Sequence, residues 1–89
     1  MPTVSDRKKI SKRVSWQSLG DTTYIYKSPN DELYLLQEVG KDIWDCISRG
    51  LFMDEIDKEL AGKYAIDETV LENDLKEFVE SMLKEGWIE

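Results

Sequence analysis

The hydrophobic pattern of this chain changes its period once, near Glu38, and this change limits the folds that the chain can adopt. Before this position, apolar residues alternate with polar ones over short runs, which is typical of half-buried β-strands. After it, apolar residues recur every three or four positions, as they do on one face of an α-helix. Strands followed by helices in a chain of 89 residues predict one small α+β domain.

Three alternating runs lie in the first half, beginning at Val14 and at positions 22–27 and 32–37. Gly20-Asp21 separates the first two runs, and Ser28-Pro29-Asn30-Asp31 separates the second from the third. Both separators are rich in residues that favour turns. Short turns join neighbouring antiparallel strands, so the pattern predicts a three-stranded antiparallel β-meander.

The third run is apolar on both of its faces. Side chains alternate along a strand, so Tyr34 and Leu36 share one face while Leu33 and Leu35 share the other. A small sheet with helices on one side needs only one apolar face. The second apolar face therefore predicts that another protein segment covers this strand.

The second half predicts three helices. The first stops at Gly50, Asp54 caps the second, and the third follows Asp67 for about five turns until Gly86. Trp87-Ile88 is expected to fold back onto the core. The apolar stripes of the helices are Ile43, Trp44 and Ile47, then Ile56, Leu60 and Tyr64, then Leu71, Leu75, Phe78, Val79 and Met82.

The composition argues against an enzyme. The chain has no histidine, which is the commonest general base and the commonest nitrogen ligand of metals. Its single cysteine, Cys46, cannot form an internal disulfide, and we expect it to be packed rather than reactive. No glycine-rich phosphate loop is present. We therefore expect no catalytic residue, no metal site and no cofactor.

Charge is unevenly distributed along a chain whose net charge is -7. Basic residues gather before residue 14, whereas 15 acidic residues and 6 basic ones follow from Glu38 onward. An acidic body repels phosphate, so we expect no nucleic acid partner, while a basic peptide would be attracted. Since no secretory signal or membrane span of about 20 apolar residues appears, we expect a cytoplasmic protein without membrane contact.

Two other functions, both involving nucleic acid, are compatible with parts of the sequence. Tyr24, Tyr26 and Tyr34 would suit a platform for stacked bases, but no basic residues are interleaved, and we expect the two that share a face to pack in the core. Strands with three helices also match a winged helix-turn-helix, although the helix at 54–64 is acidic. A winged-helix transcription regulator and a non-catalytic protein-interaction module stay open as alternatives.

Several segments together resemble the PqqD-like family, whose members are also known as RiPP precursor recognition elements. These segments are YLLQEVGKDIWDCISRG at 34–50, a DEIxxEL helix from Asp54, YAID at 64–67, and DLKEFVESMLKEGWI at 74–88. The resemblance covers the chain from about Val14 to Ile88. Where the family often has Leu-Asn at the end of the third strand, this chain has Leu36-Gln37, so we expect different capping of the first helix.

The resemblance implies a function that the residues alone would not give. Such domains bind the leader region of a ribosomally synthesised precursor peptide, which adds as a strand to strand 3 and rests against helix 3. In this sequence, the positions that match the leader-binding residues are Leu33, Tyr34, Leu35, Leu36, Val70, Asn73, Asp74, Glu77, Phe78 and Ser81. The resemblance thus predicts a binding cleft between these two elements.

The resemblance also implies partners and a domain layout. We expect residues 1–11 to be a flexible basic arm and residues 12–89 to be a stand-alone PqqD-like peptide-binding domain. Stand-alone members are similar to those that present precursors to a separate modifying enzyme. Such enzymes are the leader peptidase and cyclase of lasso peptide pathways and the radical-SAM enzymes of other pathways.

Overall fold

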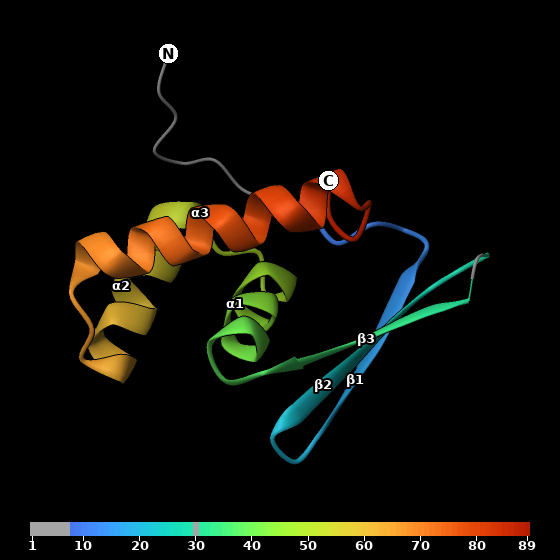
Figure 1. Ribbon diagram of the computed structural model, residues 1–89, viewed down its shortest axis with the longest axis horizontal. Helices are drawn as coiled ribbons and strands as arrows, with labels where there is room; N and C mark the ends of the chain where they lie inside the picture. The colour runs from blue at the N-terminus through green and yellow to red at the C-terminus, as the bar shows by residue number, and fades with distance from the viewer. Residues whose placement is uncertain (1–7, 30) are drawn as a thin grey trace.

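The computed structural model describes residues 8–29 and 31–89 as three strands followed by three helices (Figure 1). The strands are β1 (Val14–Leu19), β2 (Thr22–Lys27) and β3 (Glu32–Gln37), and the helices are α1 (Glu38–Ser48), α2 (Met53–Tyr64) and α3 (Glu68–Lys84). The sheet has the order β1-β2-β3 with both pairs antiparallel. The predicted α+β class and the β-meander are therefore confirmed.

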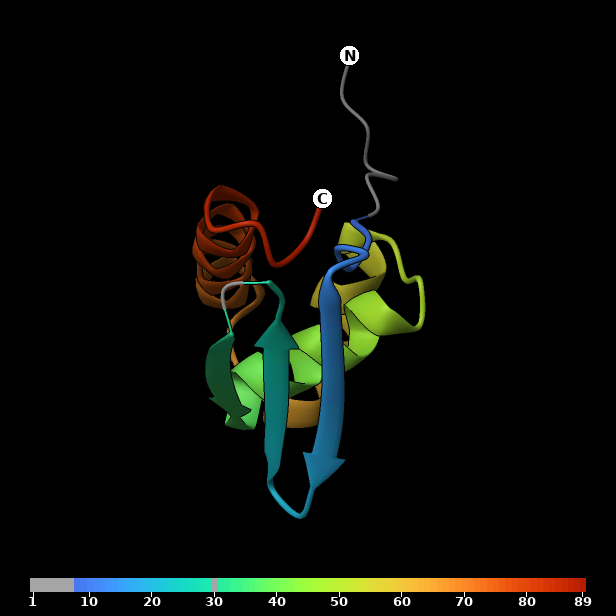
Figure 2. The same cartoon turned by 90° about the vertical axis from the view of Figure 1, so that its right-hand side faces the viewer.

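The helices cover only one face of the sheet. Figure 2 looks onto the opposite face, with the helices behind the strands. Val14, Ile25 and Leu36 are the buried apolar residues of the three strands, and they point toward the helices. The strand register places Ile25 beside Trp16 on β1, which meets the ring of Trp44 edge-on at 5.9 Å between centroids. The core thus lies between this inner face and the helices.

The chain folds back after α3, as the sequence predicts. Gly86 has φ +83, a conformation that favours glycine, and it turns the backbone toward the core. Trp87 and Ile88 are both buried there. Placing a large aromatic side chain in the core after the last helix gives a small domain more buried apolar area.

Ile88 also pairs with Ile10 in an antiparallel bridge, which corrects the expected domain boundary. The backbones of Lys9 and Glu89 exchange hydrogen bonds of 2.9 and 2.7 Å, and the N–H of Ser11 donates to Trp87 O at 3.0 Å. Residues 9–11 therefore belong to the folded domain rather than to a flexible arm ending at residue 11. Residues 1–7 of the predicted arm lie outside the described residues.

Helix starts follow the prediction in α3 but not in α2. Asp67 caps α3, because its carboxylate accepts a hydrogen bond of 2.8 Å from Thr69 N. The prediction of Asp54 as the cap of α2 is wrong, since the helix begins at Met53 with Phe52 at the capping position. Glu55 reaches back to accept the Phe52 N–H at 2.8 Å, and this bond satisfies the exposed donor one turn earlier.

The start of α1 has no side-chain cap. Gln37 occupies the capping position, but its side chain makes no cap hydrogen bond. Its amide donates instead to Thr22 Oγ1 on the neighbouring strand, at 2.9 Å. Glu38 follows with φ +54, an uncommon conformation for a residue with a side chain.

Candidate peptide-binding site

One edge of β3 is available for pairing in the described structure. β3 pairs with β2 along its full length, from Glu32 opposite Lys27 to Gln37 opposite Thr22, and no other described strand lies on its far side. Figure 2 shows this edge on the same side of the molecule as α3. An unpaired strand edge presents a row of N–H and C=O groups that can accept another strand.

The side chains of β3 are more exposed than its sequence would suggest. Leu33 and Leu35 are 59% and 51% exposed, and no helix covers the face on which they lie. Leu36, on the opposite face, is buried, with only 4% of its surface exposed. The uncovered second apolar face that alternation predicts is therefore present, whereas Leu36 belongs to the core.

Tyr34 lies on the helix-facing side, where it connects β3 to the C-terminal segment. Its ring stacks on Trp87 with the centroids 6.1 Å apart. Lys27 holds the same corner, because its Nζ lies 3.0 Å from Glu32 Oε1 and 4.6 Å from the Trp87 ring centroid. Lys27 also donates to the carbonyl of Glu85, just past the end of α3. These contacts fix the start of β3 relative to the end of α3.

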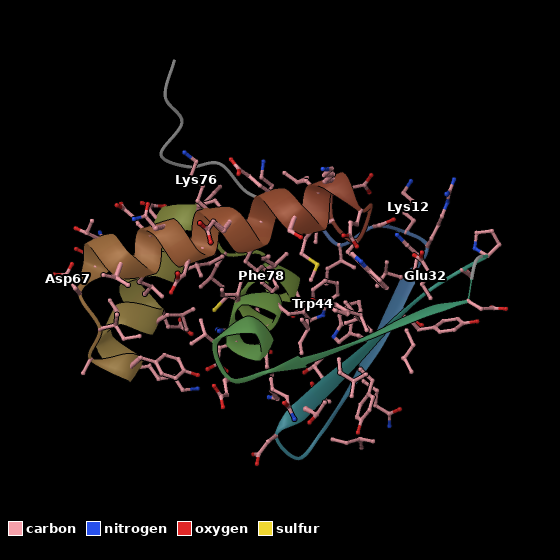
Figure 3. The ribbon with its side chains drawn as sticks, in the orientation of Figure 1. Lys12, Glu32, Trp44, Asp67, Lys76 and Phe78 are labelled. Atoms are coloured by element: carbon pink, nitrogen blue, oxygen red, sulfur yellow. The ribbon has the colours of Figure 1, made fainter. Side chains whose placement is uncertain are left out.

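The other end of β3 is fixed by Phe78. A Cβ built on Gly40 would lie 3.4 Å from Phe78 Cε2 and 3.8 Å from Leu36 Cδ2. Gly40 therefore leaves the space into which Phe78 packs, and Figure 3 shows Phe78 between α3 and α1. Phe78 is half-buried and packs against the core.

A stripe of exposed residues, polar except for Val70, runs along α3 beside Phe78. Val70, Asp74, Glu77 and Ser81 are spaced by four, three and four positions, so they share one face of the helix. All four are exposed. Because Phe78 lies between this stripe and the buried stripe, and packs beside Leu36, the polar stripe lies on the β3 side of α3. We call it the α3 stripe; Asn73, also exposed, lies at its outer margin.

The structure thus brings most of the predicted positions together around an open surface. Leu33, Tyr34 and Leu35 border the free edge of β3, and the α3 stripe lies beyond it, while Leu36 and Phe78 serve the core. Leu33 lines one hollow of the surface and Asn73 another, but none of the described hollows is lined by both β3 and α3. The predicted cleft therefore takes the form of an exposed sheet edge beside a helix.

The comparisons with known proteins identify the family to which this arrangement belongs. The model of the family described as "Coenzyme PQQ synthesis protein D (PqqD)" matches residues 23–88. This chain belongs to the PqqD family. A search of curated proteins finds no match.

A solved structure supports the same assignment for the PqqD fold of this chain. The structure described as "TbiB1 in Complex with the TbiA(beta) Leader Peptide" matches with a TM-score of 0.87 and 25% sequence identity. The match covers 91% of this chain and 94% of that chain. The match therefore extends over most of the described fold.

Two groups outside the candidate site, Cys46 and Asp42, have shifted pKa values because of their packing and hydrogen bonds. Cys46 is buried, and burial, together with the carboxylate of Glu59, raises the pKa of its thiol to about 11. Burial of Asp42 opposes its ionisation, but hydrogen bonds from Tyr64 and Lys63 outweigh it and lower the pKa of the carboxyl. Within residues 8–29 and 31–89, no group of His, Cys, Asp and Glu side chains could hold a metal ion. No described helix meets the length and hydropathy needed for a membrane span.

The sequence does not identify two residues that position β3. Lys27 and Gly40 position the two ends of β3, yet the sequence gives neither a distinguishing signal. The prediction that Tyr24 and Tyr26 pack in the core is also wrong. Both lie on the uncovered face of the sheet, whereas Tyr34 lies on the face toward the helices. Ile25, between the two tyrosines, points into the core.

Proposed function

We propose that this chain binds the leader region of a ribosomally synthesised precursor peptide and presents it to a peptide-modifying enzyme. The observation that carries the proposal is the uncovered edge of β3, with Leu33 and Leu35 exposed, in a fold that matches a leader-peptide complex. Exposed apolar edge strands are a liability that proteins normally protect. A peptide that pairs with this edge would cover it, which explains why the edge is left exposed in the free domain.

The proposed mode of binding is strand addition. The backbone of the leader pairs with the free edge of β3, which supplies affinity that does not depend on sequence. Alternate leader side chains then lie beside Leu33 and Leu35, and the remaining ones lie toward Tyr34 and the α3 stripe. Asp74 and Glu77 on that stripe favour a leader that carries a basic residue among the side chains that lie toward the stripe.

The first test replaces Leu35 by Asp. Leu35 is half-exposed in the free domain, so the variant should fold. In the complex the leader covers this side chain, and a charge there should weaken leader binding by more than about 2 kcal/mol, roughly 30-fold in Kd. The matched control is Leu19→Asp, which changes a residue of similar exposure on the opposite edge of the same face. The probe is a synthetic peptide that copies the leader of the cognate precursor, and its binding is followed by tryptophan fluorescence.

A second variant tests the α3 stripe. Asp74→Lys should weaken binding of a leader that carries a basic residue, because it replaces attraction by repulsion. Raising the salt concentration should narrow the difference between variant and parent. If Leu35→Asp and Asp74→Lys both keep native circular dichroism and bind the leader as tightly as the parent, the binding site lies elsewhere.

The proposal extends to the role of the chain in its pathway. We place it in the cytoplasm, where ribosomal precursors are made, as a non-catalytic partner of a lasso-type leader peptidase and cyclase or of a radical-SAM enzyme. Purified alone, the protein should leave the precursor chemically unchanged in mass spectra. Modification of the precursor without a second protein would refute the non-catalytic role.

A further inference from the structure

A hollow lined mainly by cations lies at the end of the sheet where β3 begins. Its volume is about 770 Å³, and four basic residues and two acidic residues border it. They are Lys9, Lys12, Arg13 and Lys27, with Glu85 and Glu89. This excess of positive charge is opposite in sign to the chain as a whole, whose net charge is -7. We call this feature the basic hollow.

Three of the four cations have no acidic partner among the described residues. Lys27 is already engaged, because its Nζ lies 3.0 Å from Glu32 Oε1 and also donates to the carbonyl of Glu85. The other three side chains are exposed, and none of them forms an ion pair within residues 8–29 and 31–89. Neighbouring like charges repel one another, and a bound anion relieves that repulsion. The basic hollow is therefore suited to an anionic ligand.

The backbone that carries these cations is held against the domain. Residues 9–11 pair with residues 87–89 through backbone hydrogen bonds. The N–H of Ser28 donates to Arg13 O at 3.1 Å, which joins the start of β1 to the turn after β2. The backbone positions of Lys12 and Arg13 are therefore fixed relative to the sheet, so a ligand meets them in a defined place.

The basic hollow adjoins the candidate peptide-binding site. Lys27 and Glu85 border the hollow, and they also join the start of β3 to the end of α3. Figure 3 shows Lys12 and Glu32 at the same end of the molecule. Under the proposed function, on which this inference rests, a leader that adds antiparallel to β3 passes Gln37 first and leaves the edge at Glu32. Its chain then continues toward the hollow.

We propose that the basic hollow binds an acidic segment of the precursor that directly follows the leader strand. The carboxylates of this segment pair with Lys9, Lys12 and Arg13, while the leader strand itself lies beside the α3 stripe. Since the α3 stripe is acidic and the hollow is basic, the two surfaces select a precursor whose charge changes sign along its length.

The same charges set the direction in which the leader lies on β3. The hollow at the other end of the strand, beside Gln37, is lined by three acidic residues and only two basic ones. A leader that ran the other way would carry its acidic segment to this second hollow and away from the cations. Unfavourable pairings of this kind select one arrangement over another.

The test compares peptides that differ only beyond the leader strand. The shortest leader peptide that the parent binds is extended at its C-terminal end with three glutamates or with three glutamines. In about 20 mM salt the parent should bind the glutamate peptide about 10-fold more tightly than the glutamine peptide. At about 0.5 M salt the difference should fall below about twofold, because salt screens exposed charges. Isothermal titration calorimetry gives the Kd values.

A double variant assigns the preference to the basic hollow. Lys12→Glu/Arg13→Glu replaces attraction by repulsion at two exposed positions, so it should lose the preference for glutamate and bind the full cognate precursor about 10-fold more weakly. It should keep native circular dichroism and bind the shortest leader within about twofold of the parent. The matched control, Lys58→Glu/Lys76→Glu, makes the same change in net charge at exposed positions on α2 and α3 and should keep the preference.

The outcomes separate this inference from the proposed function. If the parent does not bind the shortest leader, the proposed function fails. If leader binding stands but the Lys12→Glu/Arg13→Glu variant binds the glutamate peptide or the full precursor as the parent does, the basic hollow is not the site of an acidic segment. A preference seen only with glutamates at the N-terminal end of the leader would overturn the direction. If sedimentation shows a parent dimer that this variant breaks, a second copy fills the hollow and the inference is overturned.

Discussion

Cys46 shows how burial settles the chemistry of a single residue. Its sulfur lies between a hydrogen bond to Glu59 Oε2 at 3.6 Å and one from Arg49 Nη2 at 3.4 Å. Burial and the nearby carboxylate favour the neutral thiol and raise its pKa from 9.0 to about 11. The ionised form, which is the reactive one, is correspondingly rare at neutral pH.

We predict that Cys46 reacts slowly with thiol reagents while the protein is folded. A pKa raised from 9.0 to about 11 lowers the thiolate fraction at pH 8 about 100-fold, and burial slows access further. The measurement is the rate of reaction with Ellman's reagent in buffer and in 6 M guanidinium. Equal rates in the two solvents would show that the thiol is accessible in the native state.

Asp57 carries an uncompensated charge. Its Oδ1 is buried and accepts no hydrogen bond from the described residues. Burial and the neighbouring carboxylate of Glu72 raise the pKa of Asp57 in the folded protein. The folded state therefore binds this proton more tightly than the unfolded state, so ionisation costs stability above the folded pKa. That cost disappears as the pH falls through the folded pKa toward the unfolded value.

Asp57→Asn should accordingly stabilise the protein at pH 7. We expect a gain on the order of 0.5 kcal/mol, seen as a rise in Tm of about 2–4 °C. The gain should shrink as the pH is lowered toward 4, because the raised pKa makes the parent carboxyl take up its proton before an ordinary aspartate does. Thermal unfolding followed by circular dichroism at both pH values measures it. A variant less stable than the parent at pH 7 would contradict the electrostatic argument.

At the scale of the elements, alternation and helical spacing predict most of this fold. The predicted run at 22–27 matches β2 and that at 32–37 matches β3, and the long helix after Asp67 begins where expected. The start of α2 was missed because Asp54 is a good capping residue by type, whereas Glu55 sets the cap through a contact that depends on geometry.

The same limit explains what was and was not predictable about the candidate site. Alternation shows that Tyr24 and Tyr26 share a face, but not which face the helices cover. That choice depends on Ile25, which is completely buried in the core. The spacing of the α3 stripe could be read from the sequence, but its position beside β3 rests on Phe78 packing against Leu36 and Gly40.

β3 itself gives a sharp prediction about the leader. A strand added at an edge uses only every second backbone N–H to pair with its neighbour, at least in an antiparallel ladder. N-methylation of one alternate set of leader amides should therefore abolish binding, and methylation of the other set should change Kd only slightly. Isothermal titration with the two methylated peptides makes the comparison. Equal losses from both peptides would argue against strand addition.

At the scale of the whole molecule, net charge separates two functions that share an architecture. A winged-helix DNA reader needs basic residues on its recognition helix, but the first turn of α2 carries Asp54 and Glu55 and the chain has a net charge of -7. Fold alone does not decide function, so the charge has to be tested directly.

We predict no measurable binding to duplex DNA at physiological salt. Non-specific DNA-binding proteins reach Kd values of about 10⁻⁴ to 10⁻⁶ M, and a protein with an acidic surface should bind more weakly than this. Fluorescence anisotropy with a labelled duplex of random sequence, titrated with protein, provides the measurement. Micromolar binding that weakens steeply with added salt would restore the transcription-regulator interpretation.

The bridge between Ile10 and Ile88 has a consequence for how such a domain can be carried by other proteins. Because Lys9 and Glu89 face each other across paired backbones, the polypeptide enters and leaves the fold about one strand spacing, roughly 5 Å, apart. A surface loop of a larger enzyme could open by that small distance and accept the whole domain as an insertion. Transplanting it would then leave the host backbone almost undisturbed, with the free edge of β3 still facing outward.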